Sequence, residues 1–550
     1  MKADGEVPPT SKNTSHESGK GARWYDPPYR ALHALRWSRL GRRLPESLKG
    51  KLTYALHFLN QFTEHQRHLA QNRDDLFGDI GVPADEHVRV PGLWMAELFP
   101  PSEFARLKAM MGTSSWDRFR VQYLRLQSNR ELLESARAGG GWRWWPVAEI
   151  VNENSTITHT DGQRTTLPDE FAMISLVAVQ VDVGLTAMLA HVQLTDTASR
   201  KLDEVWHSAH EPRLVRVDGQ TIAEDRMWSG FRTTQQARRR VHDLARHWMA
   251  RTCPGAFASL GQAQPLMDLL LTDRFDPTDA STPVPHPDRN AFRALGLTRY
   301  ETFPGTCPEL PGLVLEQVEV GLCPAMNGER TWSLWGNTAS VVTQAGSLSA
   351  YGQDSAQAIA SLAGKRTRNF FVQLAITELL ELMERRYAAI RDQARVRHGK
   401  FKGKDIRRLR EDLLTLSIDL SSIARDVQAF NARTWRDEGD CQFTLDESAA
   451  QARRTAEHGH KPFEAVDWNM DMAKRQGQHL DRLQTADRDY REILSTTVSL
   501  GASLDAYRVG RVAIWIAVAS LAVSAAALLT VSPDSDAPLA RIFRWLGSLW

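Results

Sequence analysis

The chain has 550 residues, of which 42% are hydrophobic and 24% charged, and its formal net charge is +2 at pH 7. These proportions are typical of globular protein and exclude a chain that is disordered throughout. A chain of this length exceeds what one hydrophobic core sustains, so we expect two or three folded units. The nearly balanced charge gives no reason to expect nucleic acid as a partner.

The cysteines indicate a reducing compartment. Cys253, Cys307, Cys323 and Cys441 are scattered without a CxxC pair, which is typical of free thiols. The segment 1–23 is rich in Ser, Lys, Gly and Pro and lacks the apolar run of a signal peptide. We therefore expect a disordered tail over 1–23 and a cytoplasmic location for the large N-terminal part.

A mainly helical region is predicted over 24–141. Its first part is basic and continues into a helical pattern with Leu52, Leu56 and Leu59 on one side. The basic residues are compatible with contact to anionic lipid or nucleic acid, but a solvated helix face is the favoured interpretation. A second helix is predicted over 102–138.

Three consecutive glycines at 139–141 end this region and precede Trp142, Trp144 and Trp145. We interpret the stretch as a joint between domains that is packed by aromatic side chains. A platform on which a ligand stacks is the alternative.

A mixed α+β domain is predicted over 142–364. Two strand-like runs cover 171–181 and 185–194, and the first is apolar enough to be a central strand. Asp-Gly pairs at 161–162 and 218–219 each lie between strand-like sequences. They predict tight hairpins, because such turns need positive φ.

Helices and further strands complete this domain. Asp196 is the expected N-cap of a helix that ends at Trp206, and a second helix is predicted over 233–249, with its arginines at 238–240 exposed. The residues 272–311 are rich in Pro and Asp and predict a loop. Short strands are expected at 313–320 and at two places within 331–344.

The stretch 365–511 predicts a helical coiled-coil stalk. One seam has apolar side chains spaced three and four residues apart, at Ile406, Leu409, Leu413, Leu416, Leu420, Ile423, Val427 and Phe430. An upstream seam contains Ile376, Leu380, Met383, Tyr387 and Ile390. A glycine-bearing turn at 398–404 separates them, so the two helices are expected to form an antiparallel hairpin.

A third helix is expected to begin after Pro462 and to continue to the membrane, because no proline interrupts it before Pro533. Its seam residues are Leu480, Leu483, Tyr490, Leu494 and Leu504. We expect the stalk to form a homo-oligomer.

The segment 512–531, VAIWIAVASLAVSAAALLTV, contains no charged residue. As a helix it is about 30 Å long, the thickness of the hydrocarbon core of a bilayer, so one transmembrane helix is predicted. Arginines flank it on both sides, and the positive-inside rule alone is indecisive. The missing signal peptide and the unpaired cysteines favour a single-pass protein of the cell inner membrane, with the N-terminal part in the cytoplasm.

The segment 532–550 predicts a short amphipathic helix that lies on the far surface of the bilayer. Its apolar face contains Leu539, Ile542, Phe543, Leu546, Leu549 and Trp550. Packing of this face into an oligomer or onto a partner protein is the alternative.

Enzyme motifs are missing from the sequence. The segment 364–367 (GKRT) lacks the GxxxxGK[ST] spacing of a phosphate-binding loop, and no GxSxG, HExxH or GxGxxG pattern occurs. We therefore predict no enzyme and name no catalytic or cofactor-binding residue.

Two histidine pairs are the only candidate metal ligands. His207 and His210 lie at the end of a predicted helix, and His458 and His460 follow Cys441. Neither pair has the spaced partners of a zinc site, so exposed histidines are favoured and no metal is predicted.

The order of these parts resembles the CorA-type divalent-cation channels: an α+β domain, a helical hairpin, and a stalk helix continuous with a C-terminal span. The resemblance covers about 150–531. The family's Gly-Met-Asn signature is replaced here by Ser-Pro-Asp-Ser-Asp at 532–536, and 532–550 is too short for a second full span.

The favoured function is a membrane-anchored cytoplasmic interaction or sensor protein that oligomerises through its stalk. A CorA-like ion-transport protein with a degenerate pore is the alternative that the resemblance implies. The lipid bilayer is the one partner that the sequence names, and the protein partner or small ligand of the α+β domain is left open.

Overall fold

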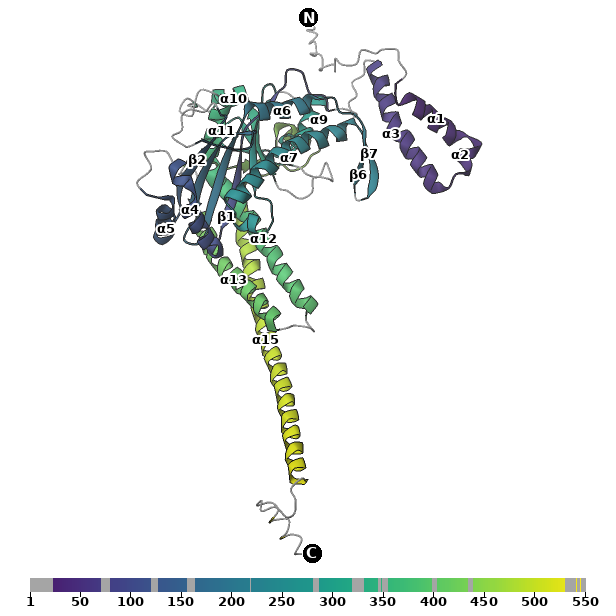
Figure 1. Ribbon diagram of the computed structural model, residues 1–550. Coiled ribbons are helices and arrows are strands. Elements are labelled where there is room, and N and C mark those ends of the chain that lie inside the picture. The colour runs from purple at the N-terminus through teal and green to yellow at the C-terminus, as the bar shows by residue number, and fades with distance from the viewer. Residues whose placement is uncertain are drawn as a thin grey trace. The chain divides into compact units, whose positions relative to one another are not determined.

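The chain divides into two compact units, Met1–Met383 with Ile418–Asp481, and Glu384–Ser417 with Arg482–Trp550. Figure 1 shows the computed structural model. It describes the residues 23–70, 80–119, 127–155, 164–217, 219–279, 286–318, 331–344, 348, 355–397, 403–433, 439–529, 541 and 545.

The first unit is built on an 11-stranded mixed sheet. Neighbouring strands are antiparallel except for two parallel pairs, β8 with β11 and β2 with β3. The order is β13 (Val466–Asp467), β12 (Thr444–Leu445), β9 (Gly305–Thr306), β10 (Leu313–Gln317), β11 (Thr331–Asn337), β8 (Leu266–Thr272), β1 (Val88–Phe99), β5 (Thr186–Leu194), β4 (Phe171–Gln180), β2 (Arg143–Asn152) and β3 (Arg164–Thr165).

Helices cover both faces of this sheet (Figure 1). On one face, Leu93 and Met95 of β1 belong to a core cluster with Leu202, Phe231 and Phe292. Those three residues come from α6 (Asp196–His207), α7 (Arg226–Thr252) and α9 (His286–Ala294). Side chains alternate along a strand, so Trp94 faces the other way, where its indole lies against Gly364 of α11 (Ser355–Arg366).

The central strand β1 lies in the range 24–141, for which the sequence predicted mainly helix. It pairs with β5 and β8, and all its residues except Arg89 are buried. Burial on both faces removes the alternation of a half-exposed strand. Pro91 and Gly92 further obscure the pattern at an irregularity, where the pairing with β8 shifts register. The sheet also takes β12 and β13 from the range 365–511, which was expected to be helical.

Several local predictions are confirmed. The strands β4 and β5 pair antiparallel, and β4 lies between β5 and β2 inside the sheet. A separate hairpin joins β6 (Arg213–Val217) to β7 (Gln220–Glu224), and Gly219 has the expected positive φ of 79°. The other predicted hairpin, at 161–162, lies outside the described residues.

Other local predictions are wrong. Within 331–344, one strand is followed by α10 (Thr338–Gln344), because the Asn337 side chain accepts the Ser340 N–H and starts a helix. The expected loop at 272–311 contains α9 and the strand β9.

The N-caps of α6 and α7 lie earlier in the chain than the sequence predicted. Thr195, rather than Asp196, caps α6, and Asp225 caps α7. Arg238 is buried, not exposed.

Trp142 and Trp144 contact the start of α12 (Arg368–Arg397). The indole N–H of Trp142 donates to Asn369 Oδ1 at 2.9 Å, and the Arg368 guanidinium lies 3.8 Å from the ring centroid of Trp144. A protein cation therefore covers one of the rings on which a ligand would stack, and the stretch 139–145 lies inside the first unit.

Further helices complete the first unit. The hairpin of α1 and α3 is held by its own small core, in which Tyr25 stacks on Phe62 with ring centroids 5.3 Å apart. These helices are α1 (Asp26–Trp37), α2 (Arg39–Arg43), α3 (Glu46–Ala70), α4 (Phe104–Thr113), α5 (Asn129–Gly139), α8 (Ala256–Ser259) and α14 (Ala449–Glu457), with 3₁₀ turns at Pro101–Glu103, Ser115–Phe119 and Arg299–Glu301.

The predicted third helix is confirmed as α15 (Trp468–Leu529), which runs for 62 residues without a break. It follows α12 and α13 (Gly403–Asn431). Every seam residue of α12 and α13 whose side chain is described is buried within the single chain. The turn at 398–402 between these helices lies outside the described residues.

In the seam of α15, the polar residue Asp487 occupies a position where an apolar side chain is expected. Tyr387 donates its hydroxyl hydrogen to Asp487 Oδ1 at 2.9 Å, and Ser417 and Arg491 also bond to this carboxylate. The buried Asp487 therefore links α12, α13 and α15 inside the second unit. Its hydrogen bonds account for an acidic residue at a seam position.

Candidate functional site

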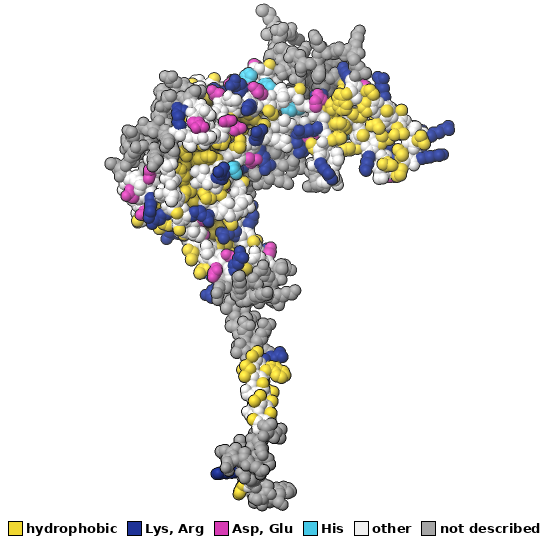
Figure 2. All heavy atoms as spheres, viewed as in Figure 1, with side chains coloured by type: hydrophobic (Ala, Val, Ile, Leu, Met, Phe, Trp, Pro, Cys, Tyr) yellow, Lys and Arg dark blue, Asp and Glu magenta, His cyan; other side chains and the backbone are white. Residues whose placement is uncertain are grey.

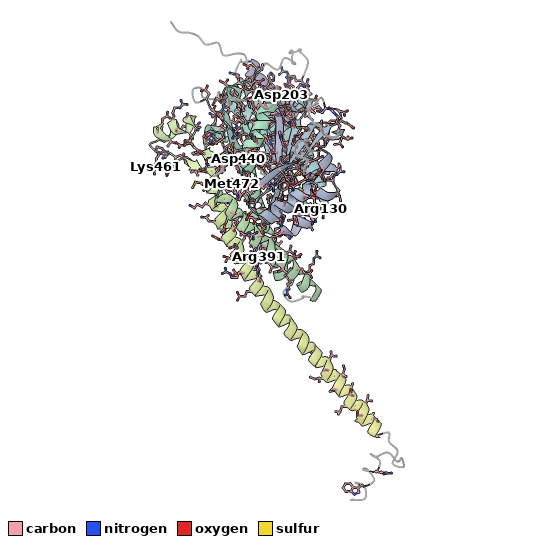
Figure 3. All side chains as sticks on the ribbon, turned by 90° about the vertical axis from the view of Figure 1, so that its left-hand side faces the viewer. Arg130, Asp203, Arg391, Asp440, Lys461 and Met472 are labelled. Atoms are coloured by element: carbon pink, nitrogen blue, oxygen red, sulfur yellow. The ribbon has the colours of Figure 1, made fainter. Side chains whose placement is uncertain are left out.

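The first candidate site is the apolar part of α15. The window Gly510–Ala527 has a mean hydropathy of 1.7, and none of it is buried. Trp515 and Leu521 are 68% and 73% exposed. Hydrophobic side chains gather along this stretch on the face seen in Figure 2, and Figure 3 shows side chains projecting from the helix there. By length and composition this helix is sufficient to cross a membrane.

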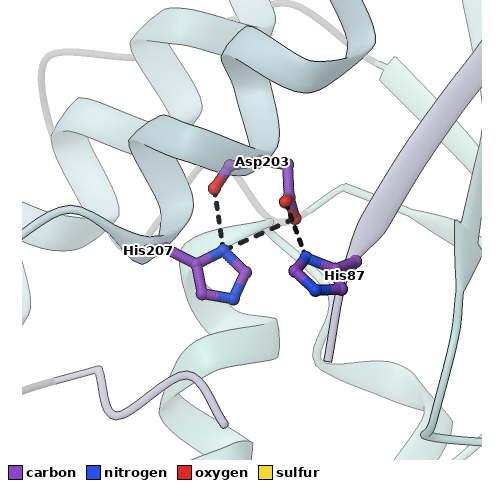
Figure 4. Close-up of side chains that lie close together, drawn as sticks. All are labelled: His87, Asp203 and His207. Carbon is purple, nitrogen blue, oxygen red and sulfur yellow. Dashed lines mark hydrogen bonds and ion pairs between the residues drawn. The ribbon is translucent and has the colours of Figure 1, made fainter. Parts of the chain in front are cut away.

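The second candidate site is a cluster of His87, Asp203 and His207 (Figure 4). His87 directly precedes β1, whereas Asp203 and His207 lie in the last two turns of α6. Residues four apart share one face of a helix, and α6 packs on β1. The packing of this helix on the central strand therefore brings the three side chains together.

Hydrogen bonds fix the carboxylate of Asp203. His87 Nδ1 lies 2.9 Å from Oδ2, and the Val88 N–H donates to Oδ1 at 2.9 Å. His207 Nδ1 is 2.9 Å from the carbonyl oxygen of Asp203 and 3.5 Å from its Oδ1. The centroids of the two imidazole rings are 5.2 Å apart.

The three side chains differ in exposure. His87 is 50% exposed, and Asp203 and His207 are 16% and 21% exposed. The hydrogen bond to Asp203 raises the pKa of His87 above its ordinary value. His207 Nε2 is buried and has no hydrogen-bond partner among the described residues.

One ligand atom from each of these residues lies within 4.8 Å of the other two. Two imidazoles and a carboxylate are the nitrogen and oxygen donors that divalent transition metals prefer. The cluster is therefore the candidate metal centre of the described part of the chain.

Only one of the four histidines considered as metal ligands in the sequence belongs to the cluster. His207 belongs to the cluster, but His210 is buried elsewhere, at 4% exposure, and the expectation that it is exposed is wrong. His458 and His460 are exposed, with parallel rings. Cys441 is buried.

Sequence reasoning missed His87 and Asp203. The spacing of Asp203 and His207, four residues apart on a helix, was the available signal. This spacing could not reveal the third residue of the cluster, because His87 is 116 positions from Asp203 in the sequence.

A buried ionic network lies in the sheet, at Asp268 of β8. Arg238 donates to both carboxylate oxygens, at 2.7 and 2.6 Å, and His242 Nε2 lies 2.9 Å from Oδ2. Burial opposes ionisation of Asp268, but Arg238 and His242 outweigh it and hold its pKa well below the usual range. The three side chains are almost inaccessible to solvent, so we assign them a structural role.

Glu97 of β1 is a second buried carboxyl group. It accepts the N–H groups of Phe257 and Ala258 at 2.7 and 3.1 Å, and Gln264 at 3.2 Å. Burial raises its pKa to about 7 in spite of these donors. The side chain satisfies the backbone at the start of α8, which also indicates a structural role.

One hollow opens beside Tyr300, Arg289, Glu301 and Ser448. Its volume of about 260 Å³ is below the range of about 300–1,000 Å³ typical of sites for small organic ligands. Arg289 is paired with Glu301 at 2.6 Å. This hollow therefore offers no free charge from that arginine.

Comparison with known proteins adds no assignment to these sites. No family model, no curated protein and no solved structure matches the chain. The two candidate sites are therefore judged on their own geometry and chemistry.

Proposed function

We propose that the protein is an interaction or sensor protein held at a membrane by one span of α15. The observation that carries the proposal is the window Gly510–Ala527, which is apolar and wholly unburied. Contiguous apolar surface is unfavourable in water, and a lipid bilayer removes it from water along the full length of such a helix.

In the proposed orientation, the span lies in the cell inner membrane and the large N-terminal part lies in the cytoplasm. Three cysteines, Cys253, Cys307 and Cys441, are free thiols in the described part of the chain. Free thiols are typical of a reducing compartment, which supports this orientation.

Self-association is the second element of the proposal. Ala513, Ala517, Ser520 and Ser524 recur three or four residues apart in the apolar part of α15, and small residues allow close approach of two helices. The seams of α12 and α13 are already buried within one chain. We therefore place the contact between copies in the span.

The segment 532–550 is proposed as an amphipathic helix at the far membrane surface. Of this segment only Arg541 and Trp545 are described, and Trp545 is 64% exposed. An exposed tryptophan near an arginine suits the headgroup region of a bilayer.

Extraction of membranes with alkaline carbonate tests the anchorage. We expect the wild-type chain to stay in the membrane fraction, and replacement of Ile516 and Leu521 by arginine to release it, since charged residues oppose insertion. Replacement of Leu414 and Ile418 by arginine is the matched control, because these α13 side chains are also exposed, at 57% and 55%. Release of the wild-type chain, or equal release of both variants, contradicts the proposal.

Ion transport of the CorA type is the alternative function. Reconstitution of the full chain in liposomes separates the two, because a membrane-anchored interaction protein gives no flux of divalent cations. Flux above that of protein-free liposomes would favour transport.

A further inference from the structure

We propose that His87, Asp203 and His207 bind a Zn²⁺ ion, with three protein ligands and one open coordination position. The three residues belong to the first unit, so the site goes beyond the proposed membrane anchorage and does not depend on it.

The donor set selects the class of metal. Mg²⁺ and Ca²⁺ prefer oxygen ligands, whereas two imidazoles with one carboxylate form a set that Zn²⁺ accepts. Three protein ligands leave the fourth tetrahedral position to water or another small ligand. His87 is half exposed, which gives an ion access to the cluster from solvent.

The distances suit an ion bound between the side chains. Bonds of about 2.0–2.1 Å in a tetrahedral site place neighbouring donor atoms about 3.3 Å apart. The separations of 2.9 Å from His87 Nδ1 to Asp203 Oδ2, and of 3.5 Å from His207 Nδ1 to Asp203 Oδ1, lie on either side of that value. One ligand atom of each side chain lies within 4.8 Å of the other two, so the widest separation has to shorten by at most about 1.5 Å for one ion to bind all three.

The surroundings hold two of the ligands in place. The Val88 N–H donates to Asp203 Oδ1 and orients the carboxylate from outside the cluster. The helix fixes His207 one turn after Asp203, and an ion bound at His207 Nδ1 replaces the contact of that nitrogen with the Asp203 carbonyl oxygen. Such outer hydrogen bonds commonly orient metal ligands.

A role for His207 separates a metal site from a simple ion pair. An ion pair between α6 and the start of β1 requires only His87 and Asp203. It gives no role to His207, whose Nδ1 lies 3.5 Å from Asp203 Oδ1. A metal site uses all three residues, so substitution of His207 is diagnostic.

The test begins with removal of metal from the full chain in detergent by a chelator. The chain is then titrated with Zn²⁺, and binding is measured by isothermal titration calorimetry. Co²⁺ is titrated in parallel, because its visible absorption reports four-coordinate binding. The variants are His87→Ala, His207→Gln and Asp203→Asn, and asparagine keeps an oxygen that accepts the Val88 N–H. His458→Ala with His460→Ala is the matched control, since both rings are exposed and lie outside the cluster.

We expect the wild-type chain and the control to bind one Zn²⁺ per chain. Each cluster variant should bind it more than about 100-fold more weakly, the upper range found for losses at outer hydrogen-bond partners. Thermal unfolding without metal must show that each variant remains folded. Failure of the wild-type chain to bind stoichiometrically overturns the proposal. So does wild-type affinity in folded His207→Gln, or loss of binding in the control alone.

Discussion

A neutral histidine with a buried ring nitrogen should make the sheet of the first unit sensitive to acid. His191 of β5 lies opposite Trp94 of β1, and the two rings stack with centroids 5.0 Å apart. Its Nε2 is buried and has no hydrogen-bond partner among the described residues. Burial lowers the pKa of His191 from 6.5 to about 4.

The direction of the change in stability follows from the difference in proton binding between the folded and the unfolded chain. Below pH 6.5 the unfolded chain binds a proton at this position, whereas the folded chain does so only near pH 4. The free energy of unfolding therefore keeps this contribution above pH 6.5 and loses it as the pH falls to about 4. At about 1.4 kcal/mol for each pH unit in that window, the loss is about 3 kcal/mol.

The perturbation is His191→Phe, which keeps an aromatic ring against Trp94 and removes the titration. A Cβ placed on Gly92 would come within 2.7 Å of His191 Nε2, so the site is tight and the larger ring has a steric cost. That cost does not depend on pH. The measured quantity is therefore the change in stability of each protein between pH 7.5 and pH 4.

The assay is urea unfolding of the full chain in detergent, followed by tryptophan fluorescence across this pH range. We expect His191→Phe to lose about 3 kcal/mol less than the wild-type chain on acidification. His460→Phe, at an exposed position, should follow the wild type. Equal losses in His191→Phe and wild type would refute the assignment of acid sensitivity to the His191 ring.

Three further substitutions test the described contacts by urea unfolding at neutral pH. Asp268→Asn leaves Arg238 buried without its anionic partner and should cost about 3–5 kcal/mol; a loss below about 1 kcal/mol would show that the ion pair is not buried as described. Tyr387→Phe removes a hydrogen bond to Asp487 and should cost about 1–3 kcal/mol, and an unchanged midpoint would contradict that bond. Gly219→Ala should cost about 1 kcal/mol because of its positive φ, and a stabilised variant would argue against the turn.

Features that depend on local sequence were predictable. The turn at Gly219 follows from the backbone freedom of glycine, and the unbroken α15 follows from the absence of proline before Pro533. The strands β4 and β5 have long β-rich runs that need no distant information.

Features that depend on tertiary contacts were not predictable. The strand β1 has no alternation to detect, because helices bury both of its faces. Arg238 was predicted to be an exposed helix residue, because the local sequence does not show that Asp268 of β8 pairs with it. In the same way, His207 carried no site by itself, because His87 reaches it only through the packing of α6 on β1.

The central claim, that α15 crosses a membrane, is tested most directly by labelling single engineered cysteines in intact and permeabilised cells. In a cysteine-free background, a membrane-impermeant maleimide should label Ser535→Cys in intact cells and Ser208→Cys, at an exposed position of the first unit, only after permeabilisation. Ala517→Cys, in the middle of the apolar window, should resist labelling in both conditions. Labelling of Ala517→Cys as rapid as that of Ser208→Cys would place the window in water and contradict the account.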